Sequence, residues 1–167
     1  RKIAVDTGVI DNDSKWRQAV GEITPDYQDV LFVKGFGGII KEAREKIEAL
    51  NEAVPEEMDQ ITFYRSVILT SEGIIRYAHR YADEAERMAE KEEDEKRRQE
   101  LLRIAGNCRR VPEYPPRSFY EAMQFIWFTQ IGGILSENPL ALNPGRFDQY
   151  MYPYYKQDID AGVIKKE

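Results

Sequence analysis

A chain of 167 residues, 42% of them hydrophobic, is long enough to bury the core of one domain. The net charge of −6 and the lack of a basic patch with interleaved aromatic residues argue against nucleic acid as a partner. No apolar run reaches the roughly 18 residues of a membrane helix, and the single cysteine, Cys108, excludes an internal disulfide framework and is typical of a reducing compartment. Because the chain starts at Arg1 instead of Met and ends without an obvious stop signal, we expect it to be part of a longer protein.

The first part of the chain predicts two helices separated by an interruption. Pro25 suits the start of a short helix, because its fixed φ fits an opening helical turn. Glycines at 35, 37 and 38 interrupt the apolar stretch that follows. From Ile39 to Leu50 the pattern is helical and strongly charged.

A long helix is expected from Pro55, because the helix dipole favours the acidic residues of its first turn. Apolar and small residues then recur at alternating spacings of three and four, which places them on one helix face. This stripe consists of Ile61, Tyr64, Ile68, Ser71, Ile75, Ala78, Ala82, Ala85 and Ala89. Because the stripe narrows to alanine, we expect a neighbouring helix to approach most closely near Ala78 to Ala89.

The balanced charges at 91–100 indicate a solvated helix face with ion pairs such as Glu92–Lys96 and Glu93–Arg97. Leu101 and its apolar neighbours return the chain to a core, and Gly106 is expected to end this helix.

A rigid connector and a buried helix are expected next. The three prolines within 112–116 cannot continue a helix. Ser118 and Glu121 then have the spacing of a capping box that opens a new helix. The body of that helix, 119–134, is apolar nearly all round, so we expect it to be buried.

The final helix is expected near Phe147–Ile159, after a loop that ends at Gly145, where glycine permits an unusual backbone turn. Pro153 falls inside this helix and should kink or divide it. Tyr150 and Tyr154 are four residues apart and share one face. We therefore interpret the tyrosine-rich stretch as an aromatic helix packed against a larger body.

Few residues suggest a chemistry by themselves. His79 is the only histidine, and without a second His or Cys at ligand spacing a packing or surface role is favoured over a metal site. Arg109 and Arg110 would lower the pKa of the Cys108 thiol, but no partner base is in view, so a structural role is favoured. Glu22 stands in an uncharged stretch and could point into a cavity, although a surface position is the simpler interpretation.

Three stretches of the chain carry distinctive motifs. They are PDYQDVLFVKGFGGII at 25–40, the Arg-Tyr-Ala, Arg-x-x-Glu-Leu, Cys-x-x-Val-Pro and Phe-x-Glu-Ala-x-Gln-x-x-Trp-Phe series at 80–128, and GRFDQYMYPYYKQDIDAG at 145–162. In this order they resemble segments of the glycyl radical enzymes of the pyruvate formate-lyase-like branch. This branch includes glycerol and propanediol dehydratases, choline trimethylamine-lyase, hydroxyproline dehydratase and arylacetate decarboxylases. The resemblance implies a mainly α segment, namely the helical N-terminal part of the ten-stranded α/β barrel of these enzymes, with 1–167 as a partial domain.

The resemblance also implies a function. The longer protein would be a radical lyase, dehydratase or formate C-acetyltransferase-like enzyme that cleaves a C–C, C–O or C–N bond of a small-molecule substrate. This segment would bind no cofactor and no metal, and the catalytic cysteine and the radical glycine would lie outside it. A radical S-adenosylmethionine activase would install the glycyl radical, and the enzyme would work anaerobically as a cytoplasmic homodimer, with neither nucleic acid nor a membrane as partner.

Three positions match places where the family contacts its substrate. Glu22 matches a polar residue that follows a glycine just upstream of Pro-Asp-Tyr, and Ala141 and Asn143 fall in the run before Gly-Arg-Phe-Asp-Gln. A carboxylate at Glu22 could hold a hydroxyl group or a cation, and it would repel a carboxylate substrate. The resemblance implies scaffold roles for Arg146 and Asp148, each of which we expect to pair with another residue.

The same resemblance excludes two local features as the radical glycine and the catalytic cysteine. Val33-Lys-Gly-Phe36 resembles the radical glycine motif but has Phe32 where the motif has arginine, and Cys108 matches a helix end instead of the catalytic cysteine.

The alternative function is a stand-alone helical module without catalysis, which would seat a partner helix on the alanine part of the long stripe.

Overall fold

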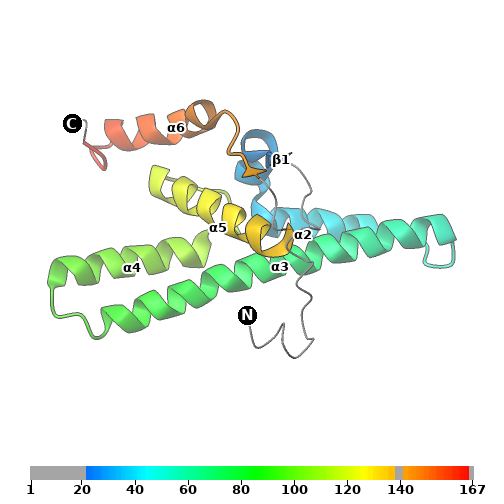
Figure 1. The fold of residues 1–167 in the computed structure, drawn as a ribbon, viewed down its shortest axis with the longest axis horizontal. Coiled ribbons are helices and arrows are strands. Elements are labelled where there is room, and N and C mark those ends of the chain that lie inside the picture. The colour runs from blue at the N-terminus through cyan, green and yellow to red at the C-terminus, as the bar shows by residue number, and fades with distance from the viewer. Residues whose placement is uncertain (1–21, 138–140, 166–167) are drawn as a thin grey trace.

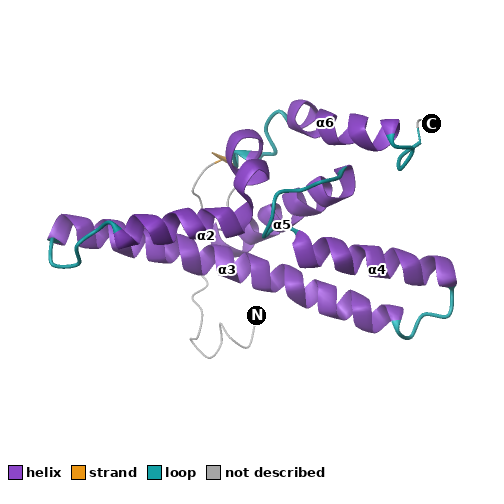
Figure 2. Cartoon of the chain, turned by 180° about the vertical axis from the view of Figure 1, so that it is seen from behind, coloured by secondary structure: helices purple, strands orange, loops and turns teal. Residues whose placement is uncertain are grey.

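The computed structural model describes residues 22–137 and 141–165, and within these ranges the chain is built almost wholly from helices. In chain order the elements are β1 (Glu22–Ile23), the π-helix η2 (Tyr27–Leu31), α2 (Phe32–Glu48), α3 (Pro55–Ala89), α4 (Glu95–Arg110), α5 (Phe119–Glu137), β2 (Ala141–Leu142) and α6 (Phe147–Asp160). The helix α3 runs nearly the whole length of the molecule, with α2 packed along its first half and α4 along its second (Figures 1 and 2). Across the middle of this layer lies α5, and α6 lies beyond it (Figure 1).

The glycine interruption is confirmed at one position. Gly35 has a φ of 64° and a ψ of 171°, which breaks α2 into two pieces. The connector between α4 and α5 docks on this break: the Phe36 amide donates to the Pro112 carbonyl at 3.0 Å, and the Gly37 amide donates to the Glu113 carbonyl at 2.9 Å. The interruption is therefore a docking point for a segment that is distant in sequence, and Gly37 itself is helical.

The stripe on α3 is confirmed as the buried face. Six of its nine members are buried, namely Ile61, Ser71, Ala78, Ala82, Ala85 and Ala89, and the other three, Tyr64, Ile68 and Ile75, are half-buried. The alanine end faces α4, whose buried residues Leu101, Ala105 and Cys108 lie on the facing side. Because α4 already covers the alanine stripe, that stripe is not free to seat a helix from another protein.

The expectation for 91–100 was wrong in two respects. The chain leaves the helix at Ala89 and turns back through 90–94, so α3 and α4 form a hairpin and the pairs expected from Glu92 and Glu93 do not form. Asp94 instead caps the new helix by accepting a hydrogen bond from the Lys96 amide at 2.9 Å. Gly106 also does not end the helix, because α4 continues to Arg110.

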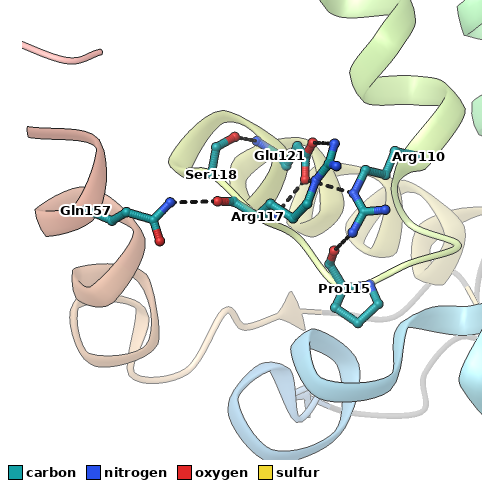
Figure 3. Close-up of polar contacts among 6 residues, drawn as sticks. All are labelled: Arg110, Pro115, Arg117, Ser118, Glu121 and Gln157. Atoms are coloured by element: carbon teal, nitrogen blue, oxygen red, sulfur yellow. Dashed lines mark hydrogen bonds and ion pairs between the residues drawn. The ribbon is translucent and has the colours of Figure 1, made fainter. Parts of the chain in front are cut away.

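The helix α5 opens as a variant of the predicted capping box. The Glu121 amide donates to Ser118 Oγ at 3.2 Å, as expected. The carboxylate of Glu121, however, reaches one residue further back and accepts from the Arg117 amide at 2.7 Å. Arg110 and Arg117 also bind this carboxylate, and Gln157 of α6 donates to the Arg117 carbonyl at 2.9 Å (Figure 3). The start of α5 therefore joins α4, the connector and α6.

The expected burial of α5 is confirmed for one of its faces only. Phe125 and Phe128 are buried, but Trp127 on the opposite face is 61% exposed. Further apolar side chains of the same helix are exposed, namely Tyr120, Met123, Ile134 and Leu135. The described part of the chain thus leaves one apolar face of α5 uncovered.

The helix α6 confirms the predicted final helix but is not divided. It continues through Pro153, whose side chain is exposed, so the carbonyl that loses its amide partner can be hydrated. Arg146 and Asp148 are both exposed, and neither forms an ion pair within the described ranges, contrary to expectation.

None of the helices in these ranges has the length and apolarity needed to cross a bilayer.

Candidate functional site

The predicted substrate residues come together in a feature that the sequence did not predict, a two-stranded parallel sheet. Glu22 of β1 is the register partner of Ala141 of β2, and Ile23 is the partner of Leu142. The Asn143 amide continues the pairing by donating to the Ile23 carbonyl at 2.8 Å. The backbone positions of Glu22, Ala141 and Asn143 therefore lie side by side, although more than a hundred residues separate the two strands; the side chain of Glu22 lies outside the described atoms.

The loop after β2 fixes the orientation of the Asn143 side chain. Its Oδ1 atom accepts a hydrogen bond from the Gly145 amide at 3.0 Å, which is an Asx turn. Gly145 has a φ of 68°, as expected for a glycine turn, and a Cβ atom there would lie 3.2 Å from Thr24 Cγ2. Because Oδ1 is used within the loop, the Nδ2 amino group is the hydrogen-bond donor that Asn143 can offer to a ligand.

Aromatic side chains join the two segments that follow the strands. Tyr27 follows β1 and Tyr150 follows β2, and their buried rings stack with centroids 5.4 Å apart. Phe32 packs edge-on against Tyr150 at 5.5 Å and against Tyr154 at 5.6 Å. The interpretation of the tyrosine-rich stretch as an aromatic helix that packs against the rest of the chain is thus confirmed for Tyr150 and Tyr154.

The Tyr150 hydroxyl donates a hydrogen bond to the Pro144 carbonyl at 2.6 Å. Burial, with a smaller contribution from neighbouring Tyr27, raises the pKa of Tyr150 to about 12. The hydroxyl is therefore protonated, and able to donate, throughout the physiological pH range.

An apolar cavity of about 370 Å³ adjoins the paired strands. Ile23 and Leu142 line it on the strand side, while Ile74 of α3 and Gly132 and Gly133 of α5 line the opposite wall. Asn143 is not part of the lining but directly follows Leu142, which is. Such a cavity could accommodate the apolar part of a small ligand.

The other candidate residues have structural partners. His79 Nε2 lies 3.5 Å from Glu113 Oε2, and the described residues contain no cluster of His, Cys, Asp and Glu that could hold a metal ion. Arg109 is held by Asp83 and Glu86, so it is not available to stabilise a thiolate at Cys108. Burial instead raises the pKa of the Cys108 thiol to about 11, which is opposite to the shift expected from the flanking arginines.

We expect the Cys108 thiol of the folded protein to resist alkylation. With a pKa near 11, only about one thiol in a thousand is ionised at pH 8, and the thiolate is the reactive form. Mass spectrometry after treatment with iodoacetamide at pH 8 should show an unmodified Cys108, while the same treatment in guanidinium chloride should modify it completely. Rapid labelling of the folded protein would contradict the buried position.

The comparisons with known proteins agree with the class that the sequence motifs resemble, the glycyl radical enzymes. A solved structure concerning 1,2-propanediol dehydration in Roseburia inulinivorans superposes with a TM-score of 0.82 at 42% identity, over 89% of this chain and 18% of that chain. A glycyl radical enzyme from Archaeoglobus fulgidus superposes with a TM-score of 0.82 at 38% identity, over 87% of this chain and 19% of that chain. Isethionate sulfite-lyase from Bilophila wadsworthia is 38% identical over 161 residues, which are 95% of this chain and 19% of that protein.

The pyruvate formate lyase-like family matches residues 1–167, and the chain belongs to this family. It spans 19% of the length of the isethionate sulfite-lyase that it matches. The resemblance noted from the motifs is thereby confirmed. The pairing of β1 with β2 had no signal in the sequence, because strands of two residues are too short to show a period.

Proposed function

We propose that this chain is the N-terminal part of a glycyl radical lyase or dehydratase that acts on a small molecule. The observation that carries the proposal is the pairing of the Glu22 and Ala141 segments, because it assembles a potential substrate wall from residues that were singled out separately. The likeness to dehydratases and a lyase over about nine-tenths of the chain supports the same function. The catalytic cysteine and the radical glycine would lie in other parts of the longer protein.

Glu22, Ala141 and Asn143 would contact the substrate. The Asn143 amino group would donate to an oxygen of the substrate, and a carboxylate at Glu22 would accept from a hydroxyl group or attract a cation. The neighbouring cavity supports an apolar contact for the remainder of the ligand. The bond to be cleaved would be C–C, C–O or C–N, and the isethionate sulfite-lyase relative adds C–S to these candidates.

The helices would pack against the ten-stranded α/β barrel of the complete enzyme. The uncovered apolar face of α5, which contains Trp127, supports this arrangement, because an exposed apolar face of that extent usually marks a contact surface. A radical S-adenosylmethionine activase would install the radical, and the enzyme would be a cytoplasmic homodimer. The alternative of a stand-alone binding module is not favoured, since α4 already covers the alanine stripe on which it depended.

The test starts with the full-length protein and its sequence beyond Glu167. We expect a chain several times longer, with a cysteine and a glycine in radical-enzyme contexts downstream. Anaerobic treatment with a radical S-adenosylmethionine activase should then give the electron paramagnetic resonance doublet of a glycyl radical, followed by turnover of isethionate or 1,2-propanediol. If neither downstream residue is present, or if no radical forms in an activase preparation that activates a control enzyme, the proposal is wrong.

A further inference from the structure

One hydroxyl group connects α6 to the loop that carries Asn143. Tyr150 lies in the first turn of α6, and long side chains in a helix point back towards its N-terminus. The hydroxyl therefore reaches the carbonyl of Pro144, to which it donates at 2.6 Å. That carbonyl belongs to the residue immediately after Asn143.

The donor is itself held rigidly. The Tyr150 ring is buried, stacks on Tyr27 and meets Phe32 and Phe147 edge-on. Tyr27 is in turn held at its hydroxyl, which accepts a hydrogen bond from Gln130 Nε2 at 3.3 Å. The Pro144 carbonyl is thus tied to the aromatic core instead of to a mobile side chain.

The bond to Pro144 lies between two contacts that orient Asn143. On one side the Asn143 amide donates to Ile23, and on the other the Gly145 amide donates to Asn143 Oδ1. A movement of the Pro144 carbonyl would directly disturb the second contact, because this carbonyl and the Gly145 amide belong to the same peptide unit. The orientation of the side-chain amide group of Asn143 therefore depends on the Tyr150 hydroxyl.

We propose that Tyr150 is a positioning residue, whose hydroxyl fixes the Pro144 carbonyl and so determines where Asn143 presents its amino group beside β1. This inference rests on the proposed function in one respect, the contact between Asn143 and substrate. The structural part concerns only the described residues and can be tested without activity.

Tyr154 provides a matched control. Its ring packs edge-on against Phe32 in the same aromatic cluster, and no hydrogen bond of its hydroxyl is present within the described ranges. Tyr150→Phe and Tyr154→Phe each delete one hydroxyl and leave the ring in place. A difference between the two variants can therefore be assigned to the hydrogen bond from Tyr150 to Pro144, because the loss of a hydroxyl group from the cluster is common to both.

The first readout is hydrogen exchange in the full-length protein, measured by mass spectrometry with fragmentation to single amides. The Gly145 amide is the sensitive probe, because Asn143 Oδ1 is its acceptor. Loss of a hydrogen bond worth about 1 kcal/mol should speed exchange at Asn143 and Gly145 roughly fivefold in Tyr150→Phe. Exchange in α3 and α5 should not change, and Tyr154→Phe should match the wild type. Equal exchange in all three proteins would overturn the inference, as would a uniform increase over all helices in Tyr150→Phe.

The second readout is kinetic and uses whichever of isethionate and 1,2-propanediol the activated wild type converts. A displaced Asn143 should raise the KM of Tyr150→Phe several-fold with kcat nearly constant, whereas Tyr154→Phe should leave both unchanged. A fall in kcat with an unchanged KM would contradict the positioning role. A wild type without radical or turnover would instead count against the proposed function, and the exchange experiment would still decide the inference.

Discussion

Replacement of Gly35 by alanine is expected to cause the largest loss of stability of any glycine-to-alanine change within the described ranges. An ideal Cβ at this position would lie 2.3 Å from the Glu113 carbonyl oxygen and 2.9 Å from the Tyr114 carbonyl carbon. Both obstacles are backbone atoms, so they cannot rotate away as the end of a side chain could. The φ of 64° with a ψ of 171° is in addition a conformation that is essentially restricted to glycine.

The expected cost combines strain with lost docking. Relief of the clash requires the connector to move away from α2, which breaks the hydrogen bonds from Phe36 and Gly37 to the connector carbonyls. The backbone strain and the loss of these hydrogen bonds together should lower the free energy of unfolding by about 3–5 kcal/mol. This change can be measured by urea unfolding followed by circular dichroism.

Other glycines give a graded control series. At Gly37 a Cβ would lie 3.0 Å from the same Glu113 oxygen, so Gly37→Ala should have an intermediate effect. Gly73 is helical with nothing within 4 Å, and Gly73→Ala should stabilise α3 by about 0.5–1 kcal/mol. The series remains informative even if Gly35→Ala does not fold. Equal unfolding midpoints for Gly35→Ala and Gly73→Ala would show that the connector does not dock on this glycine.

The helices of the fold could be predicted because their signals are local. The stripe from Ile61 to Ala89 repeats with the period of a helix and correctly identified the buried face of α3. The hairpin after Ala89 was missed because the residues that follow are charged and good helix formers, so only the capping aspartate, Asp94, marks a new start.

The candidate site was less accessible to sequence reasoning. The family resemblance supplied Glu22, Ala141 and Asn143, but their proximity depends on a register between distant strands that no local pattern encodes. Similarly, the flanking arginines of Cys108 suggested a lowered pKa, and that inference fails because the thiol is buried and Arg109 is held by Asp83 and Glu86. The local sequence could identify candidate residues such as Cys108, but their environment in the folded chain depends on tertiary packing.

Replacement of Glu121 is expected to cause the second largest loss of folding stability, after that of Gly35. The buried carboxylate of Glu121 holds three segments together, namely α4, the connector and α5 (Figure 3). The Glu121 side chain is 8% exposed and accepts from the Arg117 amide, from Arg117 Nη2 at 3.0 Å and from Arg110 Nε at 3.3 Å. Arg110 also donates to the Pro115 carbonyl at 2.9 Å, which ties the connector to α4. Glu121→Ala should therefore lower the free energy of unfolding by about 2–3 kcal/mol, at the lower end for a broken buried pair because Arg117 can return to water. Glu84→Ala, which removes an exposed pair with Arg87, should cause no measurable loss.

A double-mutant cycle separates the two arginines. The Arg110 side chain is 26% exposed, whereas that of Arg117 is 67% exposed, so solvent screens the second pair much more. We expect a coupling energy of about 1–2 kcal/mol between Glu121→Gln and Arg110→Gln, and less than about 0.5 kcal/mol between Glu121→Gln and Arg117→Gln. Urea unfolding of the single and double variants gives both values. The reverse order would mean that the exposed guanidinium of Arg117, and not the bridge to Arg110 of α4, is the stronger side-chain partner of Glu121.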